Sequence, residues 1–307
     1  MTAELMNGKA FAKEWNLKTA KLAEEFFNRF KIKPKLVAII VGDDPASAIY
    51  VGSKERACKK FGLESEVIKF DKDIKTKVLL EKIEKLNKDK AVNGILVQQP
   101  LPSQIDLDLV VESIAPEKDV DGFHPSSLGK LLIGQKCLLP CTPRGIIQIM
   151  KKYEVPIKGK NTVVIGRSVI VGKPIALLLL QEHATVTICH SRTENLPEVA
   201  SSADILVCAI GKPAMIDSSY VKKDAVVIDV GVNRVSRNDA WKDLLKPESR
   251  TALDFEKKGY TIVGDVDFPD VVQKAGLITP VPGGIGPLTI AMLLRNTIDA
   301  ANMQMQL

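Results

Sequence analysis

Short runs of branched apolar residues alternate with helix-like segments along most of the 307 residues, and this alternation constrains the fold more than any other feature. In the first half, strands are predicted at 35–42, 65–70 and 94–102, and helices at 7–30, 45–61 and 75–89. Strands that alternate with helices form parallel sheets, because each connecting helix returns over a face of the sheet. The predicted fold class is therefore α/β.

The same alternation resumes in the second half, which begins near Gly145. Strands are predicted at 161–166, 185–190, 204–210, 225–233 and 260–266, with helices at 172–183 and 196–203. A chain of this length is long for one core, so we expect two domains. They are an α/β domain over residues 1–144 and a Rossmann-like domain with a parallel sheet over 145–280. Residues 281–307 are predicted to form a C-terminal helix that packs back on the first domain.

Composition narrows the classes of function. The net charge is +6, but the basic residues are scattered and only 5% of residues are aromatic, which argues against a nucleic-acid surface built on stacking. The charge favours either attraction of anionic small molecules or an ordinary solvated surface. No apolar run approaches the roughly 18 to 20 residues of a membrane span, and the N-terminus lacks a secretory pattern. The five cysteines include no CxxC pair, so we expect a reducing cytoplasm and no structural metal.

A glycine-containing turn at 163–174, VVIGRSVIVGKP, marks a candidate phosphate site. A strand is predicted to end at Gly166, and a helix to begin near Gly172, with Ser168 between them. Backbone N–H groups and the positive end of such a helix attract phosphate. The spacing departs from the usual GxGxxG, so a plain strand-to-helix turn remains the alternative.

The following strand indicates which dinucleotide would bind. Its end carries Ser191 and Arg192, with no carboxylate before Glu194, and Arg167 lies in the preceding loop. An NAD site normally has an acidic residue here to bind the ribose hydroxyls. A hydroxyl and guanidinium groups suit a 2′-phosphate instead, so the sequence favours NADP. The alternative is that both arginines are ordinary surface charges.

The helix predicted after Asp44 places a lysine among apolar residues. Asp44 can cap the helix, Pro45 suits its first turn, and Gly62 suits its end. One stripe of this helix carries Tyr50, Ser53, Lys54, Ala57, Cys58 and Phe61. A lysine on that stripe is partly removed from water, which disfavours its charged form and suits proton transfer. The alternative is a lysine whose stem is buried while its amine reaches solvent.

Six stretches together resemble one known family. They are YVGSK (50–54), VQQPLP (97–102), PEKDVDG (116–122), VVIGRSVIVGKP (163–174), CHSRT (189–193) and TPVPGGIGPLT (279–289). The chain resembles, nearly end to end, the bifunctional methylenetetrahydrofolate dehydrogenase/cyclohydrolase family, called FolD in bacteria.

The resemblance implies roles for individual residues. Tyr50 would stack on the folate, Lys54 would be the catalytic lysine, Gln98 would tune it, and Asp121 would hold the pterin ring, while Asp119 is expected to be structural. The loop carrying the substrate-binding residues Pro280, Pro282, Gly283 and Gly284 would line the cleft where nicotinamide meets folate. The NADP contacts implied by the resemblance are Gly166, Arg167, Ser168, Ser191 and Val232.

The resemblance also implies the reaction. The enzyme would oxidise 5,10-methylenetetrahydrofolate with NADP and hydrolyse the methenyl product to 10-formyltetrahydrofolate, as a homodimer that pairs through its nucleotide-binding domains. The alternatives are another two-domain dehydrogenase of the shikimate or amino-acid type and a non-catalytic nucleotide-binding regulator. One stretch, 234–260, is longer than the family pattern, and we expect a surface excursion there.

Overall fold

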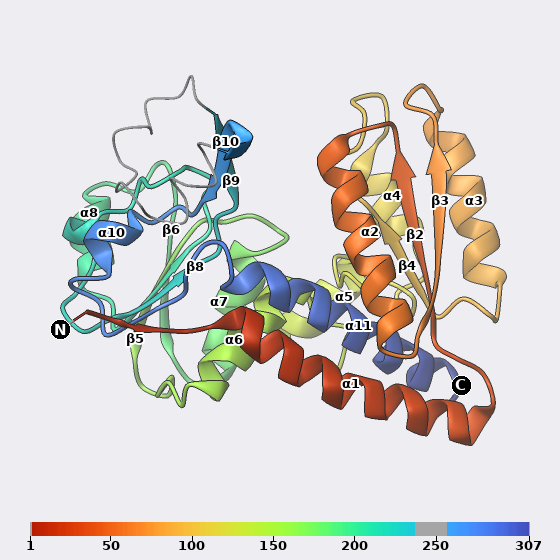
Figure 1. Ribbon diagram of the computed structural model, residues 1–307, viewed down its shortest axis with the longest axis horizontal. Helices are drawn as coiled ribbons and strands as arrows, with labels where there is room; N and C mark the ends of the chain where they lie inside the picture. The colour runs from red at the N-terminus through yellow and green to blue at the C-terminus, as the bar shows by residue number, and fades with distance from the viewer. Residues whose placement is uncertain (1, 237–256, 307) are drawn as a thin grey trace. The chain divides into compact units, whose positions relative to one another are not determined.

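The computed structural model describes residues 2–236 and 257–306. Two compact units are present (Figure 1). The first unit comprises Ala12–Cys141 and Thr289–Leu307, and the second unit comprises Met1–Phe11 and Thr142–Leu288. The N-terminal eleven residues therefore belong to the second unit, whereas the sequence placed residues 1–144 in one domain. The cause is a long-range strand pairing, in which β1 (Glu4–Leu5) pairs in parallel with β11 (Leu277–Ile278).

The first unit is built on a three-stranded parallel sheet with the order β3-β2-β4. Its elements are α1 (Gly8–Phe30), β2 (Lys35–Val41), α2 (Pro45–Lys60), β3 (Glu64–Phe70), α3 (Thr76–Lys88), β4 (Gly94–Val97), α4 (Leu107–Ser113) and α5 (Pro125–Leu132). The sequence predicted all of these elements except the two short helices α4 and α5. On one face of the sheet, Val37 and Ile39 pack with Leu79 and Ile83 of α3 and Val110 of α4. The sheet thus fixes the loops that follow its strands.

The C-terminal helix α11 (Ile285–Gln304) contributes most of its length to the first unit, as predicted. The buried Asn296 donates through Nδ2 to the carbonyl oxygens of Val120 and Leu139, at 2.7 and 2.8 Å. Gln304 donates through Nε2 to the carbonyl oxygens of Asn93 and Glu117, each at 2.9 Å. Two of these bonds, to Val120 and Glu117, attach the helix to the loop that precedes Asp121, and the other two attach it to the segments before α6 and β4.

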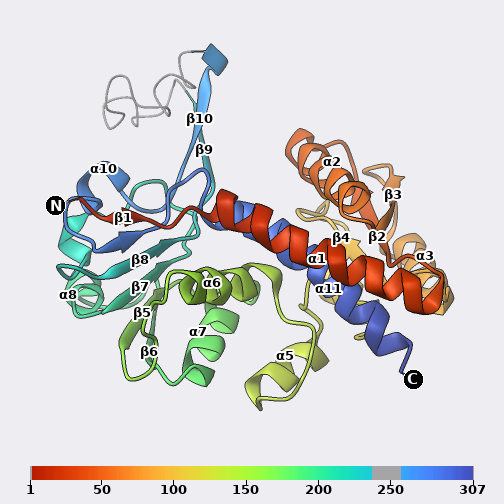
Figure 2. The same ribbon diagram turned by 60° about the horizontal axis from the view of Figure 1, so that its bottom comes forward.

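The second unit is a six-stranded parallel sheet with the order β1-β11-β8-β7-β5-β6 (Figure 2). Its further elements are α6 (Cys141–Lys152), β5 (Asn161–Ile165), α7 (Gly172–Gln181), β6 (Thr185–Cys189), α8 (Leu196–Ser201), β7 (Ile205–Cys208), the 3-10 helix η1 (Ser218–Tyr220), β8 (Val226–Asp229) and α10 (Phe268–Val271). This is the doubly wound, Rossmann-like arrangement that the sequence predicted.

One predicted strand does not continue the parallel sheet. The segment 225–233 contributes β8 to the sheet as expected, but β10 (Tyr260–Val263), within the predicted strand 260–266, forms a separate antiparallel pair with β9 (Asn233–Ser236). Only residues 230–232 separate β8 from β9, and a parallel neighbour needs a crossover of about a dozen residues or more. Most of the stretch expected as a surface excursion, residues 237–256, lies outside the described residues.

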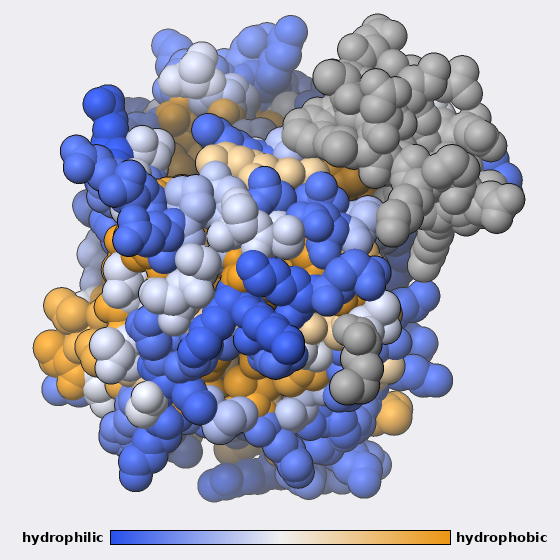
Figure 3. Space-filling model, turned by 90° about the vertical axis from the view of Figure 1, so that its left-hand side faces the viewer, coloured by the Kyte–Doolittle hydropathy of each residue, from blue (hydrophilic) through white to orange (hydrophobic). Residues whose placement is uncertain are grey.

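Hydrophilic residues predominate on the face of the molecule drawn in Figure 3, and the hydrophobic areas between them are small. Within residues 2–236 and 257–306, no helix has the length and apolar character to cross a membrane.

Candidate functional site

Helix α2 carries Tyr50 and Lys54 one turn apart, and the structure confirms its predicted limits. The Asp44 carboxylate accepts the Ser47 N–H at 2.7 Å, which satisfies one of the free donors at the start of the helix. The chain leaves the helix through Gly62, whose φ of +87° favours glycine.

Lys54 is buried, with 7% of its surface exposed, and meets a side chain from the neighbouring strand. Its Nζ donates to Oε1 of Gln98 at 2.9 Å. Gln98 directly follows β4, and its Nε2 donates in turn to the Gln99 carbonyl, which fixes the amide with its oxygen toward the lysine. The Tyr50 ring centroid lies 5.9 Å from Nζ, a cation–π distance, and burial raises the pKa of the phenol. Helix and sheet thus bring together three of the predicted residues.

Asp121 and Asp119 have different surroundings on one loop. Asp119 is buried and accepts the N–H groups of Gly122 and His124, at 3.1 and 2.7 Å, so it shapes the loop. The half-buried Asp121 carboxylate has no hydrogen-bond donor among the described residues, and burial raises its pKa to about 6 against the opposing charge of Lys54. Asp121 is therefore the carboxylate available to a ligand.

The turn between β5 and α7 requires both of its glycines. A Cβ on Gly166, whose φ is +127°, would overlap the carbonyl of Ala209, and one on Gly172 would overlap the carbonyl of Gly166. The Ser168 hydroxyl accepts the N–H groups of Val171 and Gly172, each at 3.2 Å. The backbone thus turns tightly at the start of α7, and the start of a helix is a place where backbone N–H groups can bind phosphate.

The loop after β6 lies beside this turn, because β5 and β6 are paired in parallel and the N–H of Gly166 donates to the Cys189 carbonyl at 2.9 Å. Arg167, Ser191 and Arg192 are exposed on these two loops. Neither guanidinium has an ion pair or hydrogen bond within the described part of the chain. Exposed, unpaired cations at adjacent loops are suited to an anionic group.

Sequence reasoning missed the residues that shape the second of these loops. The Nδ1 of His190 accepts the Arg192 N–H at 3.1 Å, and the Thr193 hydroxyl accepts the His190 N–H at 2.9 Å. A histidine directly after a strand, followed by serine and threonine, is the turn-like signal that would have revealed them.

The remaining predicted site residues lie in loops of the second unit. Val232 is 54% exposed after β8. The loop with Pro280, Pro282, Gly283 and Gly284 follows β11, contains a cis Val281–Pro282 bond, and is held by the Lys9 N–H, which donates to the Gly283 carbonyl at 2.8 Å. At Gly283, φ is +110°.

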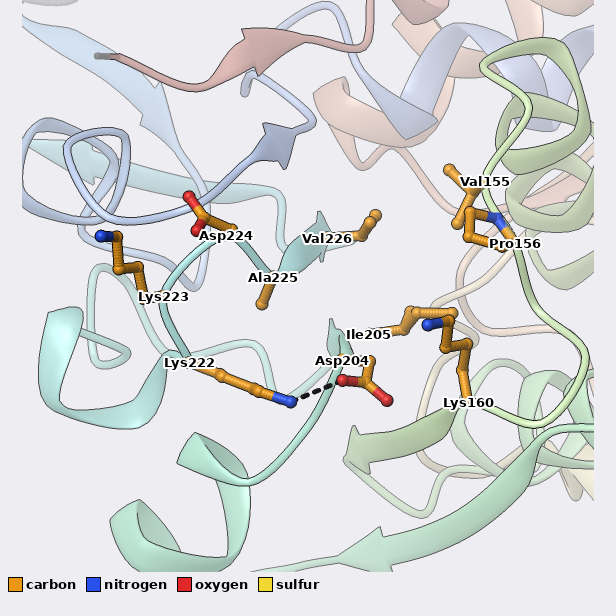
Figure 4. A pocket seen from close by; sticks show the side chains of 10 residues that line it. All are labelled: Val155, Pro156, Lys160, Asp204, Ile205, Lys222, Lys223, Asp224, Ala225 and Val226. Carbon is orange, nitrogen blue, oxygen red and sulfur yellow. Dashed lines mark hydrogen bonds and ion pairs between the residues drawn. The ribbon is translucent and has the colours of Figure 1, made fainter.

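A cavity of about 230 Å³ lies at the opposite edge of the second unit's sheet, where β7 and β8 begin (Figure 4). The Lys222 amine reaches the Asp204 carboxylate there at 2.6 Å, and Lys160, Lys223 and Asp224 complete its charged lining. None of the predicted site residues lines it. Cofactors bind at the carboxyl ends of parallel strands in such folds, so this cavity is not the expected cofactor site. In the described residues, no cluster of histidine, cysteine or acidic side chains is suited to hold a metal.

Comparison with known proteins gives a consistent result across the chain. Residues 6–121 match the catalytic domain of tetrahydrofolate dehydrogenase/cyclohydrolase, and residues 140–305 match the NAD(P)-binding domain of the same family. The bifunctional protein FolD of Anoxybacillus flavithermus is 50% identical over 304 residues, covering 99% of both chains. That of Moorella thermoacetica is 49% identical, covering 98% of this chain and 99% of its own.

Solved structures agree with the sequence relatives. The FolD crystal structure from Campylobacter jejuni is 42% identical with a TM-score of 0.88, and covers 98% of this chain and 99% of its own. The Trypanosoma brucei enzyme, solved with NADP cofactor and an inhibitor, is 33% identical with a TM-score of 0.90 and covers 100% of both chains.

Proposed function

Since the chain belongs to the tetrahydrofolate dehydrogenase/cyclohydrolase family, we propose that a folate site built around Lys54 and a dinucleotide site at the turn after β5 carry its two activities. The protein is an NADP-dependent methylenetetrahydrofolate dehydrogenase and a methenyltetrahydrofolate cyclohydrolase. The comparisons support this function rather than a shikimate-type dehydrogenase or a non-catalytic regulator.

The two units divide the ligands between them in this proposal. The first unit is the folate-binding, catalytic domain, and the second unit binds NADP. Support comes from the two family matches, which fall on different halves of the chain, and from Lys54, Gln98 and Asp121, which all lie in the first unit.

In the folate site, each residue has one task. The half-exposed ring of Tyr50 stacks on the flat pterin, and the unpaired Asp121 carboxylate accepts hydrogen bonds from its aminopyrimidine edge. Lys54 transfers protons, and Gln98 holds the amine in place through the 2.9 Å hydrogen bond. The residues that the proposal assigns to the substrate from the second unit are those of the loop after β11, namely Pro280, Pro282, Gly283 and Gly284.

The residues after β5, β6 and β8 fit NADP. Gly166 and Gly172 permit the tight turn after β5, because a Cβ at either position would overlap the backbone, and this turn presents Ser168 and the start of α7 to a phosphate. Arg167, Ser191 and Arg192 bind the 2′-phosphate, and Val232 contacts the cofactor. When bound, NADP accepts the hydride that leaves the methylene carbon of the substrate.

Lys54 serves the hydrolytic step. A water oxygen attacks the methenyl carbon between the two substrate nitrogens and loses one proton, which leaves a hydroxyl group on that carbon. The bond from that carbon to the ring nitrogen N5 then breaks while the hydroxyl loses its proton to become the formyl oxygen and N5 takes a proton. The products are 10-formyltetrahydrofolate and one released proton. Lys54 is the group placed to move these protons, a role that typically accelerates such steps by about 10² to 10⁴-fold. Loss of hydride needs no protein base, because the substrate nitrogens supply the electron pair.

The experiment that tests this division is Lys54→Met, which keeps the apolar stem and removes the amine. Cyclohydrolase activity should fall at least about 100-fold, while NADPH formation from methylenetetrahydrofolate persists and the methenyl compound accumulates, visible by its absorbance. Lys59→Met, on the exposed side of the same helix, is the matched control and should leave both activities unchanged. Parallel loss of both activities while folate still binds would refute the assignment.

The finer expectations for assembly and location are also proposals. The enzyme forms a homodimer through its second unit, supported by the edge strand β6, which carries no charged residue and, among the described residues, pairs with β5 alone. It acts in the cytoplasm, in keeping with five free cysteines. Recovery of the protein outside the cytosolic fraction of its cells would contradict this location.

A further inference from the structure

Two buried carboxylates lie at the edge of the second unit's sheet where the parallel strands end. Asp229 is the last residue of β8, and Asp265 comes two residues after β10, with 2% and 0% of their surfaces exposed. Neither belongs to the sites described above. A buried carboxylate is costly unless it is fully hydrogen-bonded, so the groups that surround these two indicate what they do.

Asp265 accepts four hydrogen bonds, three from the loop after β7 and one from the first residue of β9. The N–H groups of Ile210 and Gly211 donate to its Oδ2 at 2.7 and 3.0 Å. The N–H of Lys212 and the side-chain Nδ2 of Asn233 donate to its Oδ1, each at 2.9 Å. One side chain therefore fixes the loop after β7 against the segment after β8.

Asp229 fixes the other side of the same region. Its Oδ1 accepts the N–H groups of Gly231 and Asp265, each at 2.9 Å, and its Oδ2 accepts the Val266 N–H at 3.1 Å. Its own N–H donates at 2.8 Å to the hydroxyl of Thr279, the residue before the Pro280 loop. The two carboxylates thus form one network across the ends of β7, β8, β10 and β11.

The backbone beside each carboxylate is glycine for a steric reason. A Cβ on Gly231 would overlap the Asp265 carboxylate, and one on Gly264 would overlap the Asp229 carboxylate. Each glycine allows the carboxylate of the other segment to approach its backbone, so segments 229–231 and 264–265 pack directly against each other.

Val232 stands between the two anchored residues. Gly231 is bonded to Asp229, and Asn233 is bonded to Asp265, while Val232 itself is 54% exposed. We infer that Asp265, supported by Asp229, is a positioning residue for NADP: it holds residues 210–212 and 231–233 so that Val232 is presented to the cofactor. This inference rests on the proposed cofactor role of Val232. Neither carboxylate needs to touch the cofactor.

Asp265→Asn tests the inference, because an amide has the same shape but only one oxygen acceptor and cannot receive all four donors. The KM for NADP should rise at least tenfold. The cyclohydrolase activity, which transfers no hydride, should stay within twofold of the wild type. Asp217→Asn is the matched control: Asp217 also accepts a backbone N–H in the second unit, from Ser219 at 2.8 Å, but in the exposed turn η1, and both activities should be unchanged.

Asn233→Ala removes only the side-chain donor and decides the question if Asp265→Asn does not fold. It should raise the KM for NADP severalfold. Where Asp265→Asn does fold, adding Asn233→Ala to it should change the KM little further, because the acceptor has already been altered. Equal loss of both activities in either single variant would assign a purely structural role, and an unchanged KM would remove any role. The wild-type enzyme is assayed first, before any variant is made. If it does not reduce NADP, that result refutes the proposed function itself and not only this inference.

Discussion

At the scale of single residues, two side chains of the same type can have different roles, because their hydrogen-bond partners differ. The first unit buries two lysines, Lys54 and Lys118. Lys118 donates to the carbonyl oxygens of Leu86 and Asp89, at 2.9 and 2.7 Å, and so satisfies acceptors at the end of α3. Lys54 meets a side-chain amide and an aromatic ring instead. The sequence predicted a lysine on the apolar side of α2, but it gave no sign of Lys118, whose partners come from about thirty residues away.

Arg167 provides a test at this scale. It is exposed and has no partner within the described residues, so Arg167→Ala should disturb nothing but a ligand contact. If it binds the 2′-phosphate, the loss should cost about 1.5 to 3 kcal/mol of NADP binding. The KM for NADP should rise at least about tenfold, and that for NAD should stay nearly constant. Equal weakening toward both dinucleotides would contradict the assignment.

At the scale of elements, the choice of residue is most restricted in the turns that bring two backbone segments close together. Local patterns predicted α2, α3 and all the strands of the first unit, because each signal is confined to neighbouring residues. The same patterns placed a strand at 260–266 but could not show its antiparallel partner. That choice depends on the short link between β8 and β9, together with hydrogen bonds between residues far apart in sequence.

The turn between β5 and α7 gives the element-scale prediction. Gly172→Ala would push a methyl group into the Gly166 carbonyl, and overpacking of this kind costs about 1–3 kcal/mol. We expect a higher KM for NADP and a lower midpoint of thermal unfolding, with cyclohydrolase activity largely kept.

Gly129→Ala is the control for this substitution. Gly129 lies inside α5, and an added Cβ there would have no heavy atom within 4 Å. Its unfolding midpoint should be equal or slightly higher, since alanine favours the helix. A Gly172→Ala enzyme with unchanged NADP kinetics would show that the turn tolerates a side chain and does not hold phosphate closely.

At the scale of the whole molecule, the proposed homodimer can be tested at the β6 edge of the second unit's sheet. The edge strand β6 carries Ile188, which is 42% exposed. Ile188→Lys should therefore convert the proposed dimer to a monomer at micromolar concentration, measured by sedimentation, because an unpaired charge on the edge opposes strand pairing.

Leu132→Lys is the control for the dimer, since Leu132 is 65% exposed but lies in the first unit. It should leave the oligomeric state unchanged. A monomeric wild type, or dissociation caused by Leu132→Lys alone, would overturn the proposed interface.

The α/β fold class was predictable, because a repeated strand–helix pattern indicates it directly. The candidate ligand residues were predicted from motifs, and Lys54 with Gln98 do lie together. The Asp229 and Asp265 network was not foreseen, because all its hydrogen bonds except that from Gly231 to Asp229 join residues 32 to 55 positions apart, and aspartate beside glycine is typical of an ordinary turn.

Asn296 has a consequence for how the protein is made. It holds the carbonyl of Val120, beside Asp121, from a helix that follows the second unit in the chain. A ribosome delivers the chain from the N-terminus, and domains generally fold as they emerge. The loop that carries Asp121 therefore lacks the hydrogen bond from Asn296 of α11 until all of residues 142–288 have been translated. During biosynthesis, the second unit can complete its sheet before the first unit acquires its final anchor.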